Sequence, residues 1–593
     1  MGGFGDRFRR WRAAALRAEL RIAPTEPQRL WILTILIGAA CGFAAVGYHE
    51  AIFVATRLLL DRAFGAAGWW WVAWSVVTPL VGGLLCGLAV RYVFPGSHGS
   101  GIPQVKVAFA SRDGAVPLRD AIGKFIVGTL QIGSGASLGL EGPTVQICAG
   151  LASTFGRLIR LSPQSRRRLI PVGAAAGIAA AFNAPLAAVT FTIEEVVGQL
   201  DQTVLSGVIV AAAIAAVIER SVLGQNPVLS VRQPYGLSDT RSLLLYACLG
   251  VAAAVAAVAF SDGLLRLRAR FRRSARIPSW AHPAIGGAVT GVLAAGVMAW
   301  CHVGGIAGGG YHVLEQALSG SLAVRVMLVL CVCKLVATVF SYSSGGVGGI
   351  FAPALFIGAT LGGAFGALDK SLFHHDDVGA FALVGMGAVF SATIRAPMTS
   401  VLIIIEMTSG YGLIVPLMIA NMSAYVLARR WRPDPIYDAL LAQDGVHLDG
   451  RAVLSALERW KLDALLAPVS RCATLRPAER PAEMLRRAAS HRDQTIFPVL
   501  DVDARVVGVV ALETLQLLED KPELESLVTA FDIASAPVFV RKTDDLRTAF
   551  ELMRAEGLHE IPVVDDADKL LGLVNERDVA QTYLRANTGG QWK

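Results

Sequence analysis

Within the first apolar half, the chain reads Ser134-Gly135-Ala136-Ser137-Leu138-Gly139-Leu140-Glu141-Gly142-Pro143 and continues into an apolar segment. Glycines followed by a proline predict that a helix begins here with exposed N–H groups. This end of a helix carries about half a positive charge and binds anions. The apolar surroundings place the Glu141 carboxylate at membrane depth, where inserting a charge costs about 2.5–3.5 kcal/mol and therefore indicates function.

The same pattern occurs again in the second half, as Ser344-Gly345-Gly346-Val347-Gly348-Gly349-Ile350-Phe351-Ala352-Pro353, at an offset of 353 − 143 = 210. Further matches follow at an offset of 397 − 185 = 212: Gly173, Ala184-Pro185, Val189 and Glu194 with Gly385, Ala396-Pro397, Val401 and Glu406. Two halves with broken-helix signatures are typical of a repeat-built transporter with its site between the halves. Phe351 occupies the Glu141 position, so one half supplies the charge and the other supplies backbone only.

The composition excludes a soluble globular protein. Of the 593 residues, 54% are hydrophobic and 17% are charged, and the mean hydropathy is +0.53. Windows such as 30–48 and 242–260 are long enough to cross or nearly cross about 30 Å of hydrocarbon. Other apolar windows are shorter and interrupted by glycine, which predicts tilted or re-entrant helices. We therefore expect an all-α polytopic membrane protein.

Arginine clusters at 7–12, 157–168, 266–276 and 429–430 flank the apolar spans. The positive-inside rule predicts that all four face the cytoplasm. Because the charge, +8 in total, flanks apolar spans instead of lining one soluble face, no nucleic-acid partner is expected. Residues 1–28 are expected to form a cytoplasmic amphipathic segment. Neither a metal-ligand spacing nor a nucleophile–base set stands out, so we expect no metal site and no enzyme.

Three glycine-flanked loops resemble the signature loops of the CLC family of chloride channels and proton/chloride exchangers. They lie at 99–103 (Gly-Ser-Gly-Ile-Pro), 139–143 and 349–353, in the family's order, and the resemblance covers roughly residues 30–440. It implies an inverted-repeat CLC transmembrane domain at 29–440, with repeats at about 30–220 and 240–430. It also implies a homodimer in the cell membrane lipid, with both termini cytoplasmic.

The resemblance implies that the Ser100 and Tyr437 hydroxyls and the Ile350 and Phe351 amides hold a dehydrated chloride. It also implies that Glu141 is the outer gate, which occupies an anion site when ionised and leaves it when protonated. The physical argument agrees, because a carboxylate at a helix N-terminus competes with chloride for the same N–H groups. For Ser100 taken alone, a simple helix cap or turn is the alternative interpretation.

A second carboxylate separates an exchanger from a passive channel. Glu194 has a repeat partner in Glu406, which predicts a shared structural role, whereas Glu195 aligns with Met407 and is not required by the repeat. In the family's exchangers the Glu195 position is the internal proton-transfer glutamate, and in its channels it is usually apolar. The resemblance therefore implies a secondary active transporter that exchanges chloride for protons.

Three alternatives stay open at this stage. The first is that Glu195 lies at a solvated helix end. The second is that the protein is a passive voltage- or pH-gated chloride channel. The third is that the soluble part is a sensor and the membrane part only its anchor. Two departures from the family pattern also matter. Leu140 stands where many relatives carry Arg or Lys. Lys106 stands where some bacterial exchangers have a carboxylate, and it is placed to pair with Glu195.

After Tyr437 the composition becomes charged, and two similar units follow at 465–522 and 528–588. Each predicts a helix and then two strands, at 496–501 and 506–510 in the first unit and at 561–565 and 570–574 in the second. The pair resembles tandem CBS domains, an α/β cytoplasmic module. This resemblance allows an adenine nucleotide as a cofactor, bound through Asp578. Asn575 replaces the usual Ser or Thr, however, so a structural or assembly role is the preferred interpretation, and transport is expected to need no cofactor.

Overall fold

The chain forms two compact units, Met1–Val446 and His447–Lys593. The computed structural model describes residues 26–111, 114–159, 161, 163–198, 202–224, 235–236, 239–274, 276–375, 377–408, 410–446, 462, 465–491, 494–512, 514–515, 528–556, 558–576 and 578–579. The predicted amphipathic segment at 1–28 lies almost entirely outside these residues.

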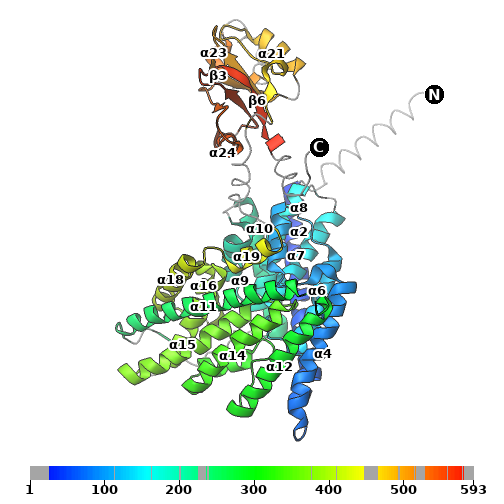
Figure 1. The fold of residues 1–593 in the computed structure, drawn as a ribbon, viewed down its shortest axis with the longest axis vertical. Coiled ribbons are helices and arrows are strands. Elements are labelled where there is room, and N and C mark those ends of the chain that lie inside the picture. Colours follow the sequence, from blue (N-terminus) through cyan, green and yellow to red (C-terminus); the bar gives the residue numbers. More distant parts are fainter. Residues whose placement is uncertain are drawn as a thin grey trace, which may run out of the picture. The chain divides into compact units, whose positions relative to one another are not determined.

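The first unit is helical throughout its described segments, apart from loops and turns (Figure 1). Its first half contains α2 (Glu26–Thr56), η1 (Arg57–Asp61), α3 (Arg62–Phe64), α4 (Trp70–Tyr92), η2 (Pro95–Ser97), α5 (Ile102–Ser111), α6 (Leu118–Gly133), α7 (Glu141–Leu158), α8 (Pro163–Phe182), α9 (Pro185–Phe191), η3 (Thr192–Val197) and α10 (Gln202–Leu223). Its second half contains α11 (Ser242–Arg273), η4 (Ser279–Ala281), α12 (His282–Cys301), α13 (Tyr311–Leu318), α14 (Val324–Ser343), α15 (Phe351–Phe373), α16 (Val378–Ile394), α17 (Pro397–Thr408), α18 (Ile414–Trp431) and α19 (Ile436–Gln443).

Seven helical segments of the described chain are long and apolar enough to cross a membrane. They are Trp31–Phe64, Trp70–Tyr92, Val204–Leu223, Ser242–Arg273, Ser279–Cys301, Val324–Ser343 and Phe351–Phe373. Between them lie helices that are too short to span, such as α5 with 10 residues and α13 with 8. This mixture confirms the expectation of long spans interrupted by short helices in a multi-pass membrane protein.

Glycines let equivalent helices of the two halves pack backbone to backbone. α4 and α12 lie side by side (Figure 1). A Cβ atom at Gly83 would overlap the backbone of Pro283, and one at Gly287 would overlap the backbone of Pro79. In lipid, where no hydrophobic effect drives helix association, close approach through small residues supplies the packing energy.

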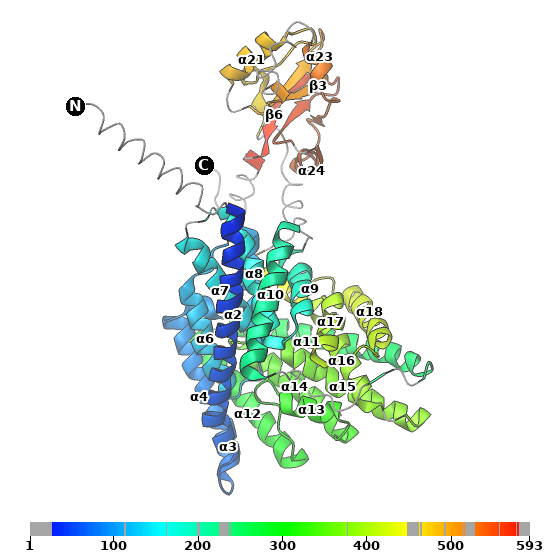
Figure 2. The same ribbon diagram turned by 180° about the vertical axis from the view of Figure 1, so that it is seen from behind.

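Two glutamates hold the halves together at α9 and α17, which lie side by side in Figure 2. The Glu194 carboxylate accepts the N–H groups of Met398 and Thr399 at 3.1 and 2.9 Å. Glu406 in turn accepts the N–H groups of Leu186 and Ala187 at 3.0 and 2.7 Å. Each glutamate therefore caps the start of the other repeat's helix, which confirms the structural role predicted for the pair.

Replacing Glu406 by Ala is expected to destabilise the fold by about 1–2 kcal/mol, because two helix N–H groups lose a charged acceptor. The measurement is thermal unfolding of the purified protein in detergent, beside Glu50→Ala on the exposed face of α2 as control. Equal melting temperatures for both variants would show that the cap contributes nothing.

The second unit contains one four-stranded sheet and one hairpin. Its elements are β1 (Ala467–Pro468), η6 (Val469–Arg471), α21 (Pro481–Ser490), β2 (Ile496–Leu500), β3 (Val506–Ala511), α23 (Ala530–Ile533), β4 (Val540–Arg541), α24 (Leu546–Glu556), β5 (Glu560–Val564) and β6 (Leu570–Asn575). The sheet order is β1-β6-β5-β4, with β4 parallel to β5, and β2 pairs with β3 in an antiparallel hairpin. Both strand pairs fall where the sequence predicts them, within one residue at each end.

A buried glutamate joins the two strand pairs. One oxygen of Glu560 accepts the N–H and the hydroxyl of Thr495 at 2.7 and 3.1 Å, while the other accepts the Asn575 side-chain amide at 3.0 Å. Around it, apolar residues of both pairs form one cluster: Ile496, Val506, Val509, Val564, Leu570 and Leu573. The two similar halves of the second unit therefore pack against each other through a shared apolar core.

Candidate functional site

The three glycine-flanked loops meet at one junction in the first unit. Gly139 and Gly349 exchange backbone hydrogen bonds, with N···O distances of 2.8 and 2.7 Å. The Gly348 N–H donates to the Gly99 carbonyl at 3.2 Å. The starts of α5, α7 and α15 are thereby held together, so the helix ends of both repeats supply N–H groups to one place.

Two buried lysines fix the loops that precede α5 and α13. The Lys124 ammonium donates to the carbonyls of residues 98–99 at 3.0 and 2.9 Å. The Lys334 ammonium donates to three carbonyls within residues 305–308 at 2.7 to 3.1 Å. The lysines are repeat equivalents (334 − 124 = 210), and both side chains are fully buried. Backbone carbonyls therefore satisfy both charges.

Glu141 is the first residue of α7, and its side chain is buried at the loop junction. One carboxylate oxygen accepts the Tyr311 hydroxyl. The second oxygen has no hydrogen-bond partner that meets geometric criteria among the described residues, although the amides of Glu141 and Ala352 face the carboxylate. A Cβ at Gly139 would overlap this second oxygen, and one at Gly349 would lie 3.5 Å from it. Glycine at these positions leaves space around the Glu141 carboxylate.

Ser100 and Tyr437 are both fully buried at this site. Neither hydroxyl makes a hydrogen bond of good geometry among the described residues, although Tyr342 lies beside Ser100. The Ser100 hydroxyl accepts no helix N–H of good geometry among the described residues, so the simple-cap interpretation of Ser100 is wrong. The Gly101 N–H donates to the Gln104 side chain at 3.1 Å. A buried hydroxyl without a partner costs about 1–3 kcal/mol, so two of them together indicate a polar ligand.

Ile350 and Phe351 lie at the start of α15, as the N-cap and the first helical residue. N–H groups in the first turn of a helix have no intrahelical acceptor and point toward the loop junction. The Phe351 ring is locked among three other rings, with centroid distances of 4.6 Å to Phe182, 5.7 Å to Phe191 and 4.2 Å to Phe390. This cluster holds the helix start in place.

Glu195 lies in the π-helical turn η3 and is buried, so its interpretation as a solvated helix end is wrong. The Lys106 ammonium contacts Glu195 at 2.7 Å and Asp438 at 2.5 Å. Side-chain exposure rises from 4% at Glu195 to 12% at Lys106 and 28% at Asp438. The three groups therefore form a charged line from the interior toward solvent. Tyr437 is close enough to interact electrostatically with both Glu195 and Glu141.

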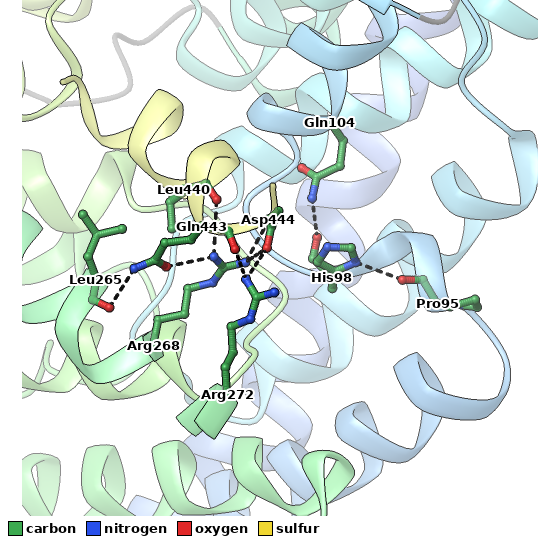
Figure 3. A network of polar contacts seen from close by, with 9 residues as sticks. All are labelled: Pro95, His98, Gln104, Leu265, Arg268, Arg272, Leu440, Gln443 and Asp444. Atoms are coloured by element: carbon green, nitrogen blue, oxygen red, sulfur yellow. Dashed lines mark hydrogen bonds and ion pairs between the residues drawn. The ribbon is translucent and has the colours of Figure 1, made fainter. Parts of the chain in front are cut away.

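The helix that carries Tyr437 is anchored at its C-terminus by α11 (Figure 3). The Arg268 guanidinium binds the Asp444 carboxylate at 2.8 and 3.0 Å and the Gln443 side chain at 3.0 Å. Arg272 binds the Gln443 carbonyl at 2.8 Å and Asp444 at 2.6 Å. Cations at a helix C-terminus complement its dipole, so Arg268 and Arg272 stabilise the C-terminal end of α19.

Three residues near the predicted site were missed in the sequence: Tyr311 binds Glu141, Lys334 interacts with Glu141 electrostatically, and Asp438 pairs with Lys106. Each had a weak signal: Tyr311 ends a glycine-rich run, Lys334 is the repeat equivalent of Lys124, and Asp438 follows Tyr437. Leu140 is buried as the N-cap of α7, and Asp578 is exposed in the second unit.

Comparisons with known proteins agree with this geometry. The family model described as voltage gated chloride channel matches residues 82–429, and a CBS domain model matches residues 530–585. The H(+)/Cl(-) exchange transporter ClcA of Salmonella paratyphi B is 33% identical over 437 residues, covering 70% of this chain and 89% of that protein. The ClcA of Salmonella newport matches with the same identity and coverage.

Among solved structures, a slow cyanobacterial Cl−/H+ antiporter has a TM-score of 0.64 and 26% identity, covering 70% of this chain and 98% of that one. A eukaryotic CLC transporter shares the fold, with a TM-score of 0.64, 20% identity and coverage of 93% and 98%. The family model spans more than half of the chain, and the curated relatives exceed 30% identity over most of their length. The chain therefore belongs to the voltage-gated chloride channel (CLC) family, with the inverted-repeat architecture of that family and a C-terminal CBS region.

Proposed function

We propose that the protein is a secondary active transporter that exchanges chloride for protons across the membrane. The observation that carries the proposal is the Glu141 carboxylate at the loop junction of both repeats, with a second buried carboxylate, Glu195, and with Tyr437 near both. Relatives that are 33% identical over 70% of this chain are named H(+)/Cl(-) exchange transporters, which supports the exchanger.

In this proposal Glu141 and chloride compete for the same N–H groups. The ionised carboxylate occupies the junction, and its protonation removes the negative charge that excludes chloride. Chloride is then held by the Ser100 and Tyr437 hydroxyls and by the Ile350 and Phe351 amides. Because occupation by one excludes the other, movement of the anion is linked to movement of the proton.

Protons reach Glu141 from the other side through Glu195. The Lys106 ammonium separates Glu195 from Asp438, and Asp438 is the most exposed of the three. One cation between two carboxylates leaves a net negative charge, which attracts a proton to the group. We assign Asp438 and Lys106 to the proton route between solvent and Glu195.

Replacing Lys106 by Met is expected to change proton flux several-fold and chloride affinity by less than about two-fold. Without the ammonium, the Glu195 and Asp438 carboxylates repel each other and share a proton, so half-maximal proton flux moves to higher pH. Parallel proton and chloride fluxes in liposomes measure this, with Lys370→Met at the exposed end of α15 as control. Equal changes in both ion fluxes would contradict the assignment.

The exchanger itself is tested with the wild-type protein in liposomes that carry an outward or inward chloride gradient and no proton gradient. Exchange predicts that chloride movement drives protons uphill, in a direction that reverses with the gradient. Chloride flux without uphill proton movement would instead identify the passive channel. Absence of both fluxes would identify the membrane part as an anchor for a sensor.

For the CBS region we propose a structural or assembly role. The Asn575 amide is bound to Glu560 inside the docked pair, which leaves the exposed Asp578 carboxylate without the neighbouring Asn575 for a ribose. These residues therefore fit a nucleotide poorly. Calorimetric titration of the full-length protein with ATP, beside Asp578→Ala, tests the alternative: saturable binding that the substitution removes would establish a nucleotide site.

We further propose that the protein works as a homodimer in the lipid of the cell membrane, with both termini in the cytoplasm. Large apolar side chains are exposed on α9, α10, α17 and α18, among them Leu186, Val217, Met398 and Val426. A subunit partner or lipid tails would cover these side chains. The arginine clusters that flank the spans support the orientation.

A further inference from the structure

We propose that Tyr311 is the latch of the Glu141 gate: its hydroxyl holds the ionised carboxylate at the loop junction and so sets how readily chloride displaces it. Tyr311 would be a positioning residue that acts through Glu141. The inference rests on the proposed exchange function and adds a residue that determines the affinity and pH range of transport.

The contact itself is specific. Tyr311 is the first residue of α13, and its hydroxyl donates to a carboxylate oxygen of Glu141 on α7. Glu141 is only 1% exposed, and Tyr311 is half-buried. The Glu141 carboxylate receives this hydrogen bond from a side chain at the junction, and hydrogen bonds to charged groups are about twice as strong as neutral ones.

The internal repeat relates the position of Tyr311 to the chloride loop of the first half. Tyr311 is the repeat equivalent of Gly101 (311 − 101 = 210), the residue next to Ser100. Each of these positions follows a loop that a buried lysine fixes, Lys124 in one half and Lys334 in the other. One half thus leaves a free serine hydroxyl for chloride, while the other directs a phenol hydroxyl at the gate.

The helices that carry Tyr311 and Tyr437 lie toward different ends of the first unit. α13 lies toward the lower end of the first unit in Figure 2, and α19, which carries Tyr437 and Asp438, lies toward the upper end in Figure 1. The helix that carries Tyr311 therefore lies toward the opposite end of the first unit from α19.

Other ionisable groups that face Glu141 do not replace this contact. Within the described residues they are Lys334 on α14, Tyr48 on α2 and Tyr437 on α19, which interact with it electrostatically. The Lys334 ammonium is already bound to three carbonyls. Neither Tyr48 nor Tyr437 forms a hydrogen bond of good geometry through its hydroxyl. Tyr311 supplies the direct bond.

Removing the hydroxyl with Tyr311→Phe is expected to weaken the binding of the ionised Glu141 carboxylate at the junction about ten-fold. This is within the range measured for hydrogen bonds to charged groups. Chloride then competes better, so the chloride concentration for half-maximal flux falls about ten-fold at alkaline pH. The difference shrinks at acid pH, where Glu141 is protonated. The pH of half-maximal chloride flux moves up by about one unit, because less acid is needed to release the gate.

The experiment measures chloride and proton flux in liposomes from pH 4.5 to 8 for wild type and Tyr311→Phe. Tyr411→Phe, which removes the hydroxyl of a highly exposed tyrosine, is the matched control and should behave as wild type. The same Tyr311→Phe change is then made in a Glu141→Ala background. There the phenol has no carboxylate to hold, so the substitution should have no effect.

The outcomes separate the two proposals. If wild type moves no protons uphill, the exchange function fails whatever Tyr311 does. If wild type exchanges the ions and Tyr311→Phe matches it at every pH, the latch is overturned. An equal effect of Tyr311→Phe with and without Glu141 would likewise overturn it, because the tyrosine would then act only through packing.

Discussion

Glu141→Ala is expected to abolish uphill proton movement entirely while chloride continues to flow down its gradient. The substitution leaves the loop junction and its N–H groups in place but removes the carboxylate that competes for them. Chloride flux should then lose its dependence on pH, because no group at the junction needs protonation before the anion binds. Simultaneous chloride and pH-electrode recordings from loaded liposomes measure both effects in one experiment.

The matched control is Glu219→Gln, which removes a buried carboxylate on α10 without touching the loop junction. It should retain coupled exchange. Coupling that persists in Glu141→Ala would refute the gate, whereas loss of coupling in both variants would point to a general effect of removing buried charge.

Glu195→Gln is expected to reduce proton flux at least ten-fold and to leave chloride flux within about two-fold of wild type. Glutamine keeps the size of the side chain but cannot carry a proton. Protons that enter at Asp438 would therefore not pass position 195 to reach Glu141. In the proposed mechanism chloride is held by hydroxyls and amides that this change does not touch. Fluxes of both ions under an imposed proton gradient give the ratio.

Glu194→Gln separates transport from structure at neighbouring positions. Its carboxylate caps α17, so the substitution should lower the melting temperature and leave the ratio of protons to chloride unchanged. If Glu195→Gln also altered only stability, the proton route would have to bypass Glu195.

The loops and the repeat could be predicted because their signals are local. Glycines before a proline dictate a helix start, and two copies of that pattern with aligned downstream residues reveal the repeat, whatever the rest of the chain does. The same reasoning found Glu141, since a lone carboxylate in apolar sequence is costly. It also separated Glu194 from Glu195, because only Glu194 recurs in the other half.

The Lys106–Glu195 pair was predicted and is confirmed at 2.7 Å, but other contacts between distant parts of the chain could not be predicted in this way. The Tyr311–Glu141 bond joins residues 170 positions apart, and the Lys106–Asp438 pair joins residues 332 positions apart. Neither tyrosine nor aspartate has a local pattern that requires it at these positions. Their roles follow only once the helix starts are brought together in space.

The reciprocal caps of Glu194 and Glu406 bear on how such a chain arises. Each glutamate satisfies the helix start that the other half presents, so a half-length ancestor and its upside-down twin would have fitted each other through one residue type. Gene duplication and fusion would preserve this fit from the first generation. Glu141 and Tyr311 mark where the two halves now differ, because Phe351 stands at the Glu141 position of the other half and Gly101 at the Tyr311 position.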